Sequence, residues 1–130
     1  MKIVKVSAIP MSAPVPMDKR HRTDLGTKVK SDATLIRVET DDGIVGWSDV
    51  ETQPHVAHAI VNAPGGGGVG FESIRAALIG ENPLERERLW QKEVRYLAYF
   101  GRQGAGMQVI SGVDIALWDL LGKDAKQPVF

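Results

Sequence analysis

The sequence predicts an α+β domain in which a three-stranded antiparallel sheet is followed by a helical bundle. Residues 2–9 and 34–48 alternate apolar and polar side chains around β-branched residues, a pattern typical of strands. The later part of the chain instead carries helix caps and glycine stops, as at Asn82-Pro83. Residues 107–121 would place apolar side chains around most of a helix, which is typical of a helix covered on more than one side.

The composition is that of a globular chain with no electrostatic preference for nucleic acid. Its 130 residues suit one domain and fall short of the roughly 250 of a complete (β/α)₈ barrel. Sixteen Lys and Arg are balanced by 16 Asp and Glu. The absence of cysteine excludes disulfides and thiolate metal sites and is typical of a reducing compartment, so we expect a cytoplasmic protein. No apolar segment has the length of a signal peptide core or a membrane span, so we expect no membrane partner.

The first strand is expected over residues 2–9. Val4, Val6 and Ala8 should share one face of this strand because side chains alternate along it. Pro10 should end or bend the strand, since proline cannot donate a ladder hydrogen bond.

A hairpin is expected over residues 34–48. Asp42-Gly43 between two β-rich runs is among the strongest turn patterns in a sequence. Gly46 within the return strand predicts a bulge or a close approach of another backbone. Together with residues 2–9, the hairpin completes a three-stranded antiparallel sheet.

Between these elements, residues 11–31 are interpreted as one long loop, because prolines interrupt any periodicity. The loop is basic, with five cations against Asp18 and Asp24, and it also contains His21. One hypothesis is that it closes over an anionic substrate and excludes water. The alternative is a disordered surface loop, and the residues alone do not decide between the two.

Helices are expected over most of the remaining chain, with boundaries set by caps and glycines. A run of glycines over residues 65–68 should form a flexible connector; it lacks the lysine of a phosphate-binding loop. The expected helices are His55–Asn62, Glu72–Ile79 before Gly80, Asn82–Tyr99, and a last helix from about Ala105 with Gly122 as its C′ residue.

Few polar residues form a recognisable catalytic pattern. His55 and His58 would share a helix face, but nothing completes a metal site, so surface histidines are the simpler interpretation. Asp114 falls within the apolar arc of the last helix, where a carboxylate is costly unless it meets a cation, backbone donors or water. We interpret Asp114 as a satisfied interface or capping carboxylate rather than a catalytic one, and Asp119 as exposed.

Four motifs resemble the N-terminal capping domain of the mandelate racemase and muconate-lactonizing branch of the enolase superfamily. The most specific is Gly-Val-Asp-Ile-Ala-Leu-Trp-Asp-Leu-Leu-Gly-Lys, which begins at Gly112. The others are Thr-Asp-Asp-Gly-Ile-Val-Gly-Trp from Thr40, Asn82-Pro83 with Leu89-Trp90 after it, and Tyr-Phe-Gly-Arg-Gln-Gly from Tyr99. The last of these is similar to a segment of acid-sugar dehydratases and racemases, and the resemblance spans essentially the whole chain.

The resemblance implies residues 1–122 as the capping domain and 123–130 as the start of a linker to a C-terminal (β/α)₈ barrel, absent from this sequence. In the family the barrel binds Mg²⁺ and supplies the acid/base groups, so no catalytic or metal-binding residue is expected here. Two capping-domain loops close over the barrel mouth and set specificity. By position they match residues 14–30 and the turn after Trp47, although Ser48-Asp49 departs from the family's Gly-Glu. The implied substrate-binding residues are His21, Arg22, Lys28, Trp47 and His55.

The expected function is therefore that of a specificity domain in a Mg²⁺-dependent enzyme that abstracts the proton α to a carboxylate. An acid-sugar dehydratase is the leading hypothesis. The chain alone should be inactive. A racemase, epimerase or cycloisomerase is the alternative within enzymes. A stand-alone binding or assembly domain is the alternative outside them. The expected partners are an acid sugar and a barrel domain or another copy of the chain, in a homo-oligomer.

Overall fold

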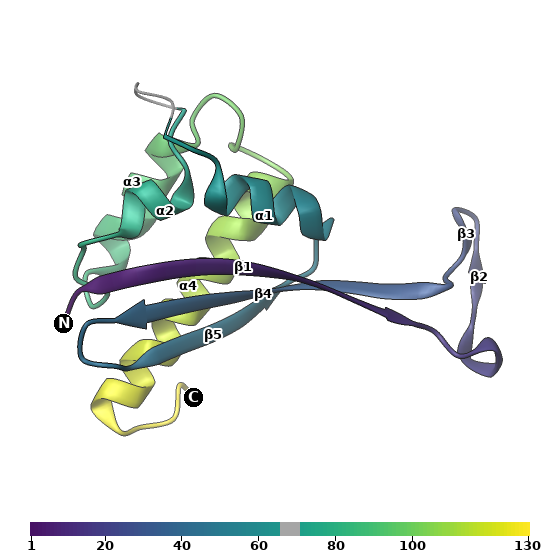
Figure 1. The fold of residues 1–130 in the computed structure, drawn as a ribbon, viewed down its shortest axis with the longest axis horizontal. Coiled ribbons are helices and arrows are strands. Elements are labelled where there is room, and N and C mark those ends of the chain that lie inside the picture. The colour runs from purple at the N-terminus through teal and green to yellow at the C-terminus, as the bar shows by residue number, and fades with distance from the viewer. Residues whose placement is uncertain (66–70) are drawn as a thin grey trace.

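The computed structural model describes residues 1–65 and 71–130 and confirms the α+β class. Three antiparallel strands form one sheet in the order β1-β4-β5, and the helices gather on one of its faces (Figure 1). The strands are β1 (Ile3–Pro14), β4 (Lys30–Thr40) and β5 (Val45–Val50). The helices are α1 (Pro54–Asn62), α2 (Ile74–Leu78), α3 (Arg86–Tyr96) and α4 (Ala105–Ala125). Of the expected glycine connector, residues 66–68 lie outside the described residues.

The first strand faces the core differently from the expectation. Ile3, Val6 and Ala8 are buried, whereas Val4 is 52% exposed. The pairing register between β1 and β4 shifts between Ile3 and Lys5, which is a β-bulge. An extra residue turns the following side chains to the opposite face, so simple alternation assigned Val4 wrongly.

The prediction of one long loop over residues 11–31 is wrong, because about half of the segment is paired in strands. β1 and β4 continue past the body as a two-stranded ribbon, with pairs that run from Pro10 and Thr34 out to Pro14 and Lys30. Pro10 does not end the strand, because β1 is an edge strand whose outer N–H groups need no partner. We call residues 11–31 the arm.

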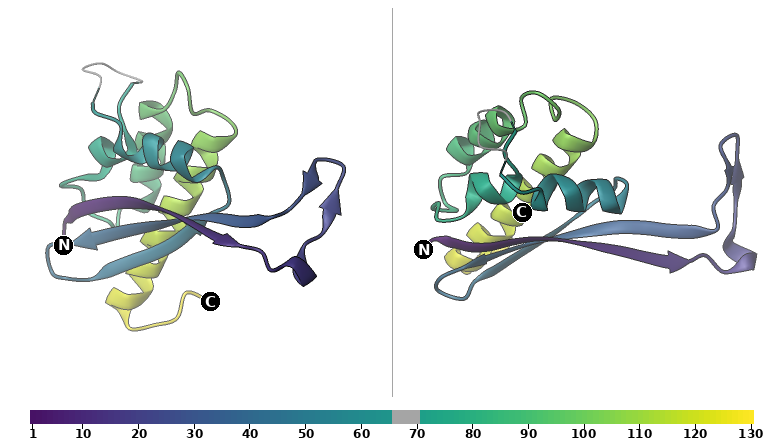
Figure 2. Two further views of the ribbon diagram at one scale, coloured as in Figure 1. Left: turned by 45° about the vertical axis from the view of Figure 1, so that its right-hand side comes forward. Right: turned by 45° about the horizontal axis from the view of Figure 1, so that its top comes forward.

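The end of the arm is a small second hairpin. A 3₁₀ turn, η1 (Met17–Lys19), leads into β2 (Arg22–Thr23), which pairs with β3 (Gly26–Thr27). Figure 2 shows from two sides that this end projects away from the helices and the rest of the sheet. We call residues 15–29 the arm tip.

The predicted hairpin over residues 34–48 is confirmed. Gly43 adopts a positive φ of 87° in the turn, which suits glycine. Gly46 is the expected close approach: a Cβ there would lie 2.1 Å from the backbone oxygen of Ala116 in α4. The small residue therefore lets α4 lie directly on β5.

The four helices exist, but several of their boundaries differ from the expectation, and α3 ends at Tyr96 rather than at Tyr99. The helix predicted from Asn82 starts at Arg86; Asn82 caps a preceding turn by accepting a hydrogen bond from the Leu84 N–H. The last helix does not end at Gly122 but continues to Ala125. Lys126 then takes the left-handed conformation, with φ of 54°, that was expected of a glycine.

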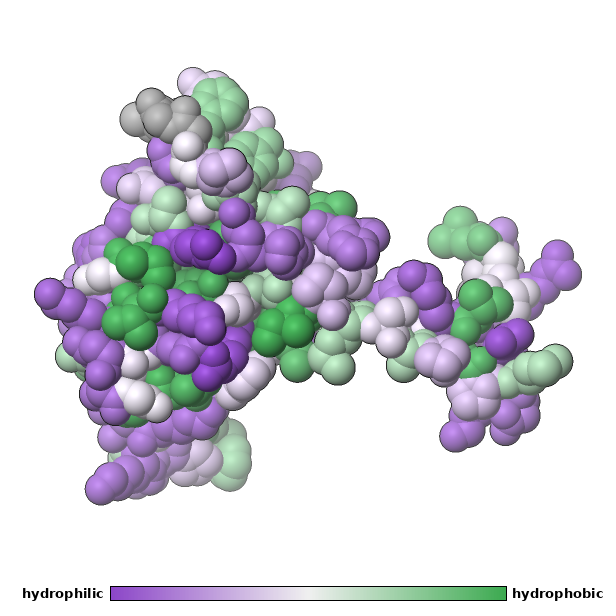
Figure 3. Space-filling view, viewed as in Figure 1, coloured by the Kyte–Doolittle hydropathy of each residue, from purple (hydrophilic) through white to green (hydrophobic). Residues whose placement is uncertain are grey.

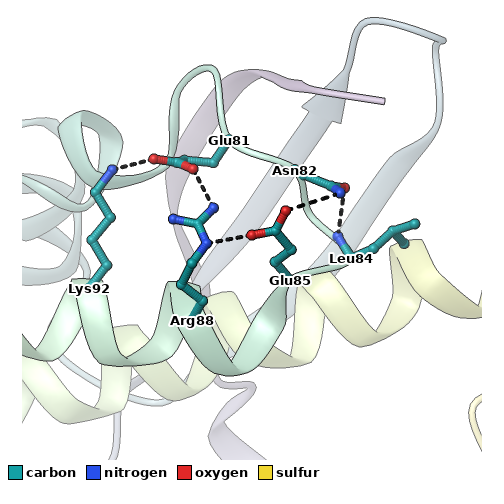
Figure 4. Close-up of polar contacts among 6 residues, drawn as sticks. All are labelled: Glu81, Asn82, Leu84, Glu85, Arg88 and Lys92. Carbon is teal, nitrogen blue, oxygen red and sulfur yellow. Dashed lines mark hydrogen bonds and ion pairs between the residues drawn. The ribbon is translucent and has the colours of Figure 1, made fainter.

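Between α2 and α3, ion pairs fix the start of α3. Arg88 donates to both Glu81 and Glu85, and Lys92 also donates to Glu81, each at 2.5 Å (Figure 4). The Arg88 guanidinium and the Lys92 ammonium hold the pKa of Glu81 below its ordinary value. These contacts make the start of α3 an ion-paired surface.

The helix α4 crosses behind the strands in the view of Figure 1 and forms the centre of the core. Five of its apolar side chains are at most 1% exposed: Val109, Ile110, Val113, Leu117 and Leu120. Its opposite side is open: Ile115 is 54% exposed and Trp118 39% exposed. Among the described helices, none has the length and hydrophobicity needed to cross a membrane.

Candidate functional site

Three of the predicted substrate-binding residues lie together at the arm tip. The N–H of Lys28 donates to the carbonyl oxygen of His21 at 3.1 Å, and Arg22 pairs with Thr27 across β2 and β3. The side chains of His21, Arg22 and Lys28 are exposed. The hairpin thus holds two cations and an imidazole on one short, ordered platform.

The surface of the arm tip is both basic and apolar. Figure 3 shows hydrophilic residues there interspersed with hydrophobic ones. Leu25 is 94% exposed and Met17 is 83% exposed. Two large apolar side chains this exposed on a short basic tip give the surface the character of a contact surface for another molecule or domain.

Trp47 is not near the arm tip. It lies on β5, next to Gly46 but on the opposite face of the sheet from α4, and is 41% exposed. The guanidinium carbon of Arg37 lies 5.4 Å from the centre of its ring, a cation–π geometry. Its backbone N–H donates to the Asp119 carboxylate at 2.8 Å.

Asp119 is therefore more than the exposed residue that we expected. Its carboxylate accepts hydrogen bonds from the Trp47 N–H and, at 2.6 Å, from Lys123. It joins α4 to the free edge of β5. Helical periodicity could not identify this role, because the partner strand lies 72 residues away in the sequence.

His55 is at the start of α1, where the arm leaves the body. It lines a pocket of about 200 Å³ between β1, β4 and α1, together with Ser12, Lys30, Asp32 and Gln53. We call this the arm-base pocket. Sequence reasoning missed Ser12, Lys30, Asp32 and Gln53, because the pocket depends on strand pairing through residues interpreted as a loop.

Asp114 has a cationic partner, as a carboxylate within an apolar arc of a helix requires. The Arg86 guanidinium donates to its carboxylate at 3.2 Å and lies over the Trp118 ring, 3.4 Å from its centre. This confirms Asp114 as a satisfied carboxylate.

Sequence reasoning missed the neighbouring carboxyl group of Glu93. Glu93 is 1% exposed, and its Oε1 has no hydrogen-bond partner. Burial and the charge of Asp114 raise the pKa of Glu93 well above its ordinary value.

An apolar groove of about 300 Å³ follows the exposed side of α4. Ile115, Trp118, Asp119 and Val129 line it. The apolar side chains suit a protein contact, because the site offers one charged group and little else for recognising a polar ligand.

The described residues do not fit a Mg²⁺ site. Magnesium prefers an octahedral set of oxygens, usually including one or two carboxylates. Within residues 1–65 and 71–130, no three His, Asp or Glu side chains lie close enough together to hold a metal ion. Glu81 and Asp114 are already ion-paired with arginines.

Comparison with known proteins supports one family. A family model described as mandelate racemase / muconate lactonizing enzyme, N-terminal domain, matches residues 5–130. A D-galactonate dehydratase of Verminephrobacter eiseniae is 40% identical over 97 residues, covering 74% of this chain and 23% of the relative. A D-galactarolactone cycloisomerase of Agrobacterium fabrum is 35% identical over 89 residues, covering 68% of this chain and 21% of the relative.

Solved structures agree with the sequence comparison. An enolase superfamily member from Polaromonas sp. JS666 is 33% identical with a TM-score of 0.79, covering 96% of this chain and 31% of that chain. A putative mandelate racemase from Bordetella bronchiseptica is 30% identical with a TM-score of 0.81, covering 95% of this chain and 30% of that chain. A racemase from Streptomyces coelicolor with bound magnesium is 28% identical with a TM-score of 0.78, covering 95% and 32%.

These matches cover only part of each relative but nearly all of this chain. The chain spans between a fifth and a quarter of the length of the curated relatives and about a third of the solved chains. The matched family model, however, extends over nearly all of its residues. The chain therefore belongs to the N-terminal domain family of the mandelate racemase and muconate lactonizing enzymes, within the enolase superfamily.

Proposed function

We propose that this chain caps the active site of a Mg²⁺-dependent acid-sugar dehydratase and contributes to its substrate specificity. The dehydration removes the proton α to the carboxylate and expels the β-hydroxyl group as water, and the resulting enol becomes a 2-keto acid. The metal and the acid/base groups belong to a barrel domain that this chain contacts. We expect the chain alone to have no such activity.

The arm is the observation that carries the proposal. Arg22 and Lys28 are held on a hairpin that projects from the body, so they can reach a ligand bound on another domain. Cations attract and orient a carboxylate through charge-assisted hydrogen bonds. The exposed Leu25 and Met17 at the same tip would cover the ligand and exclude water.

The contact with the barrel is assigned to the open side of α4. Ile115 and Trp118 are exposed there beside Val129, in the groove described above. Covering this groove would bury apolar area at roughly 25 cal/mol per Å². We assign the cation–π pair of Arg86 and Trp118 to the rim of the same contact.

Product analysis tests the proposed reaction. A protein that joins this chain to its barrel would be incubated with Mg²⁺ and five- and six-carbon acid sugars, and the products followed by ¹H NMR. We expect 2-keto-3-deoxy acids, with one molecule of water lost per turnover. The similarity to a D-galactarolactone cycloisomerase favours a second candidate, an isomerisation. A product of unchanged mass would support that candidate and refute the dehydratase.

A further inference from the structure

We infer that the arm-base pocket binds the distal hydroxyl groups of a polyhydroxy monoacid, and that Asp32 is the residue that selects for them. The inference rests on the proposed function, which supplies the hydroxylated acid. It adds a second contact region that is separate from the arm tip. The carboxylate of the ligand would lie in the barrel, beside the groups that react with it, and its far end would enter this pocket.

Backbone pairing builds the pocket, so its walls are ordered. Ser12 pairs with Asp32 across β1 and β4. Asp32 lies two residues before Thr34 and four before Ile36, both of them buried, so it points to the helix side of the sheet. The third wall is the start of α1, where the Gln53 side chain caps the helix by accepting from the Val56 N–H at 2.9 Å.

Asp32 is an acceptor with one oxygen unused. Its Oδ2 meets the Lys30 ammonium at 2.9 Å, while Oδ1 is shielded from water and has no hydrogen-bond partner. The Lys30 ammonium beside it holds the pKa of Asp32 below its ordinary value, so the group stays ionised at neutral pH. Keeping an acceptor away from water without a hydrogen bond costs free energy. A hydroxyl group of the ligand could donate to Oδ1 after a small rotation of the carboxylate.

The other polar groups complete a set suited to hydroxyl groups. A sugar hydroxyl donates one hydrogen bond and accepts others, and the pocket combines the Asp32 acceptor with donors on Lys30 and the Gln53 amide. A second carboxylate on the ligand would instead be repelled by Asp32. The pocket therefore favours an aldonic acid, which ends in a hydroxyl group, over the matching aldaric acid, which ends in a carboxylate.

The size of the pocket fits the end of a substrate rather than a whole one. Complete ligand sites usually measure about 300–1,000 Å³. The arm-base pocket measures about 200 Å³. At about 30 Å³ for each water-sized group, this leaves room for a few hydroxylated carbons.

The test uses the protein that joins this chain to its barrel, and it compares three kinds of substrate. These are aldonic acids, their analogues without the terminal hydroxyl group, and the matching aldaric acids. Asp32→Asn should lower kcat/KM for the aldonic acid by about 10- to 100-fold, because a charged acceptor is lost. It should leave the deoxy analogue within about twofold and reduce the preference for aldonic over aldaric acid.

Two further variants separate recognition from folding. Lys30→Met, which removes the partner charge and keeps the stem, should also lower the discrimination between the aldonic acid and its deoxy analogue. Asp42→Asn is the matched control: Asp42 is a hydrogen-bonded carboxylate with a lowered pKa in the β4–β5 turn, outside the pocket. Asp42→Asn should behave as wild type with all three substrates.

Each outcome has a distinct meaning. Unchanged discrimination in Asp32→Asn, or an equal loss with the aldonic acid and its deoxy analogue, would overturn the pocket and leave the dehydratase proposal intact. No turnover of any acid by the wild-type protein would overturn the dehydratase proposal, and this inference with it. A wild-type preference for aldaric acids would overturn the role of Asp32 even if the protein is a dehydratase.

Discussion

At the residue scale, two glycines determine how closely α4 approaches the sheet. A Cβ on Gly46 would lie 2.1 Å from the Ala116 oxygen, and one on Gly112 would lie 2.3 Å from a methyl group of Val50. The close approach lets the Ser48 hydroxyl donate to the Gly112 carbonyl oxygen at 2.5 Å. At Gly46, backbone is therefore packed against backbone, which cannot yield as a flexible side chain would.

Gly46→Ala should destabilise the domain by about 1–3 kcal/mol or more, because the added methyl group overpacks a rigid contact. Urea unfolding followed by circular dichroism measures the loss. Gly43→Asn is the comparison, since Gly43 has φ of 87° and open space around it, and Asn tolerates that conformation. If both variants lost the same small amount of stability, the close approach of α4 would be wrong.

Glu93 should make stability depend on pH. Burial and the charge of Asp114 raise its pKa, so its stabilising contribution is complete below the unfolded pKa of about 4.3 and is lost as pH rises through the folded pKa. Glu93→Gln removes that ionisation. The variant should therefore gain stability relative to wild type as pH rises from 4 to 9, measured by urea unfolding at each pH. A difference that stays constant with pH would show that Glu93 does not titrate as proposed.

At the scale of elements, sequence patterns correctly predicted the features that depend only on neighbouring residues. The Asp42-Gly43 turn, the approach at Gly46 and helix α1 follow from neighbouring residues, and the structure has them. The arm did not follow, because Pro10 is tolerated once β1 lies at the edge of the sheet. Edge position is a property of the assembled sheet, which no local pattern contains.

The same reason explains what was missed at the candidate site. His21, Arg22 and Lys28 could be chosen by charge and by family resemblance, and the structure groups them on one hairpin. Asp32 could not, because it meets Ser12 only through a register set by the whole β1–β4 ribbon. Glu93 is an ordinary charged residue in sequence, and only packing against α4 reveals its burial.

The arm tip should be dispensable for folding. Every residue of the arm lies outside the buried core. Replacing residues 15–29 with Asn-Gly would close β1 and β4 by a two-residue turn between the paired Pro14 and Lys30. We expect a stability change below about 1 kcal/mol, roughly 5 °C or less in Tm for a domain of this size. Loss of the cooperative thermal transition would show that the arm supports the core.

At the scale of the whole molecule, structural and recognition surfaces are separated. The core lies between the sheet and the helices, with α4 at its centre. The basic arm tip and the arm-base pocket lie toward one end, and the apolar groove follows α4. This layout matches a domain that docks through one helix and extends another part over a ligand.

The measurement that tests this account most directly is a comparison of substrate and metal affinity in Arg22→Ala, in the protein that joins this chain to its barrel. Arg95→Ala, at an exposed arginine of α3, is the matched control. We predict that Arg22→Ala lowers kcat/KM for acid sugars by about tenfold or more, as expected for a lost charge-assisted hydrogen bond, while the Kd for Mg²⁺ stays unchanged. Wild-type kinetics in Arg22→Ala, or an equal loss of turnover and Mg²⁺ affinity, would contradict a substrate-contacting arm.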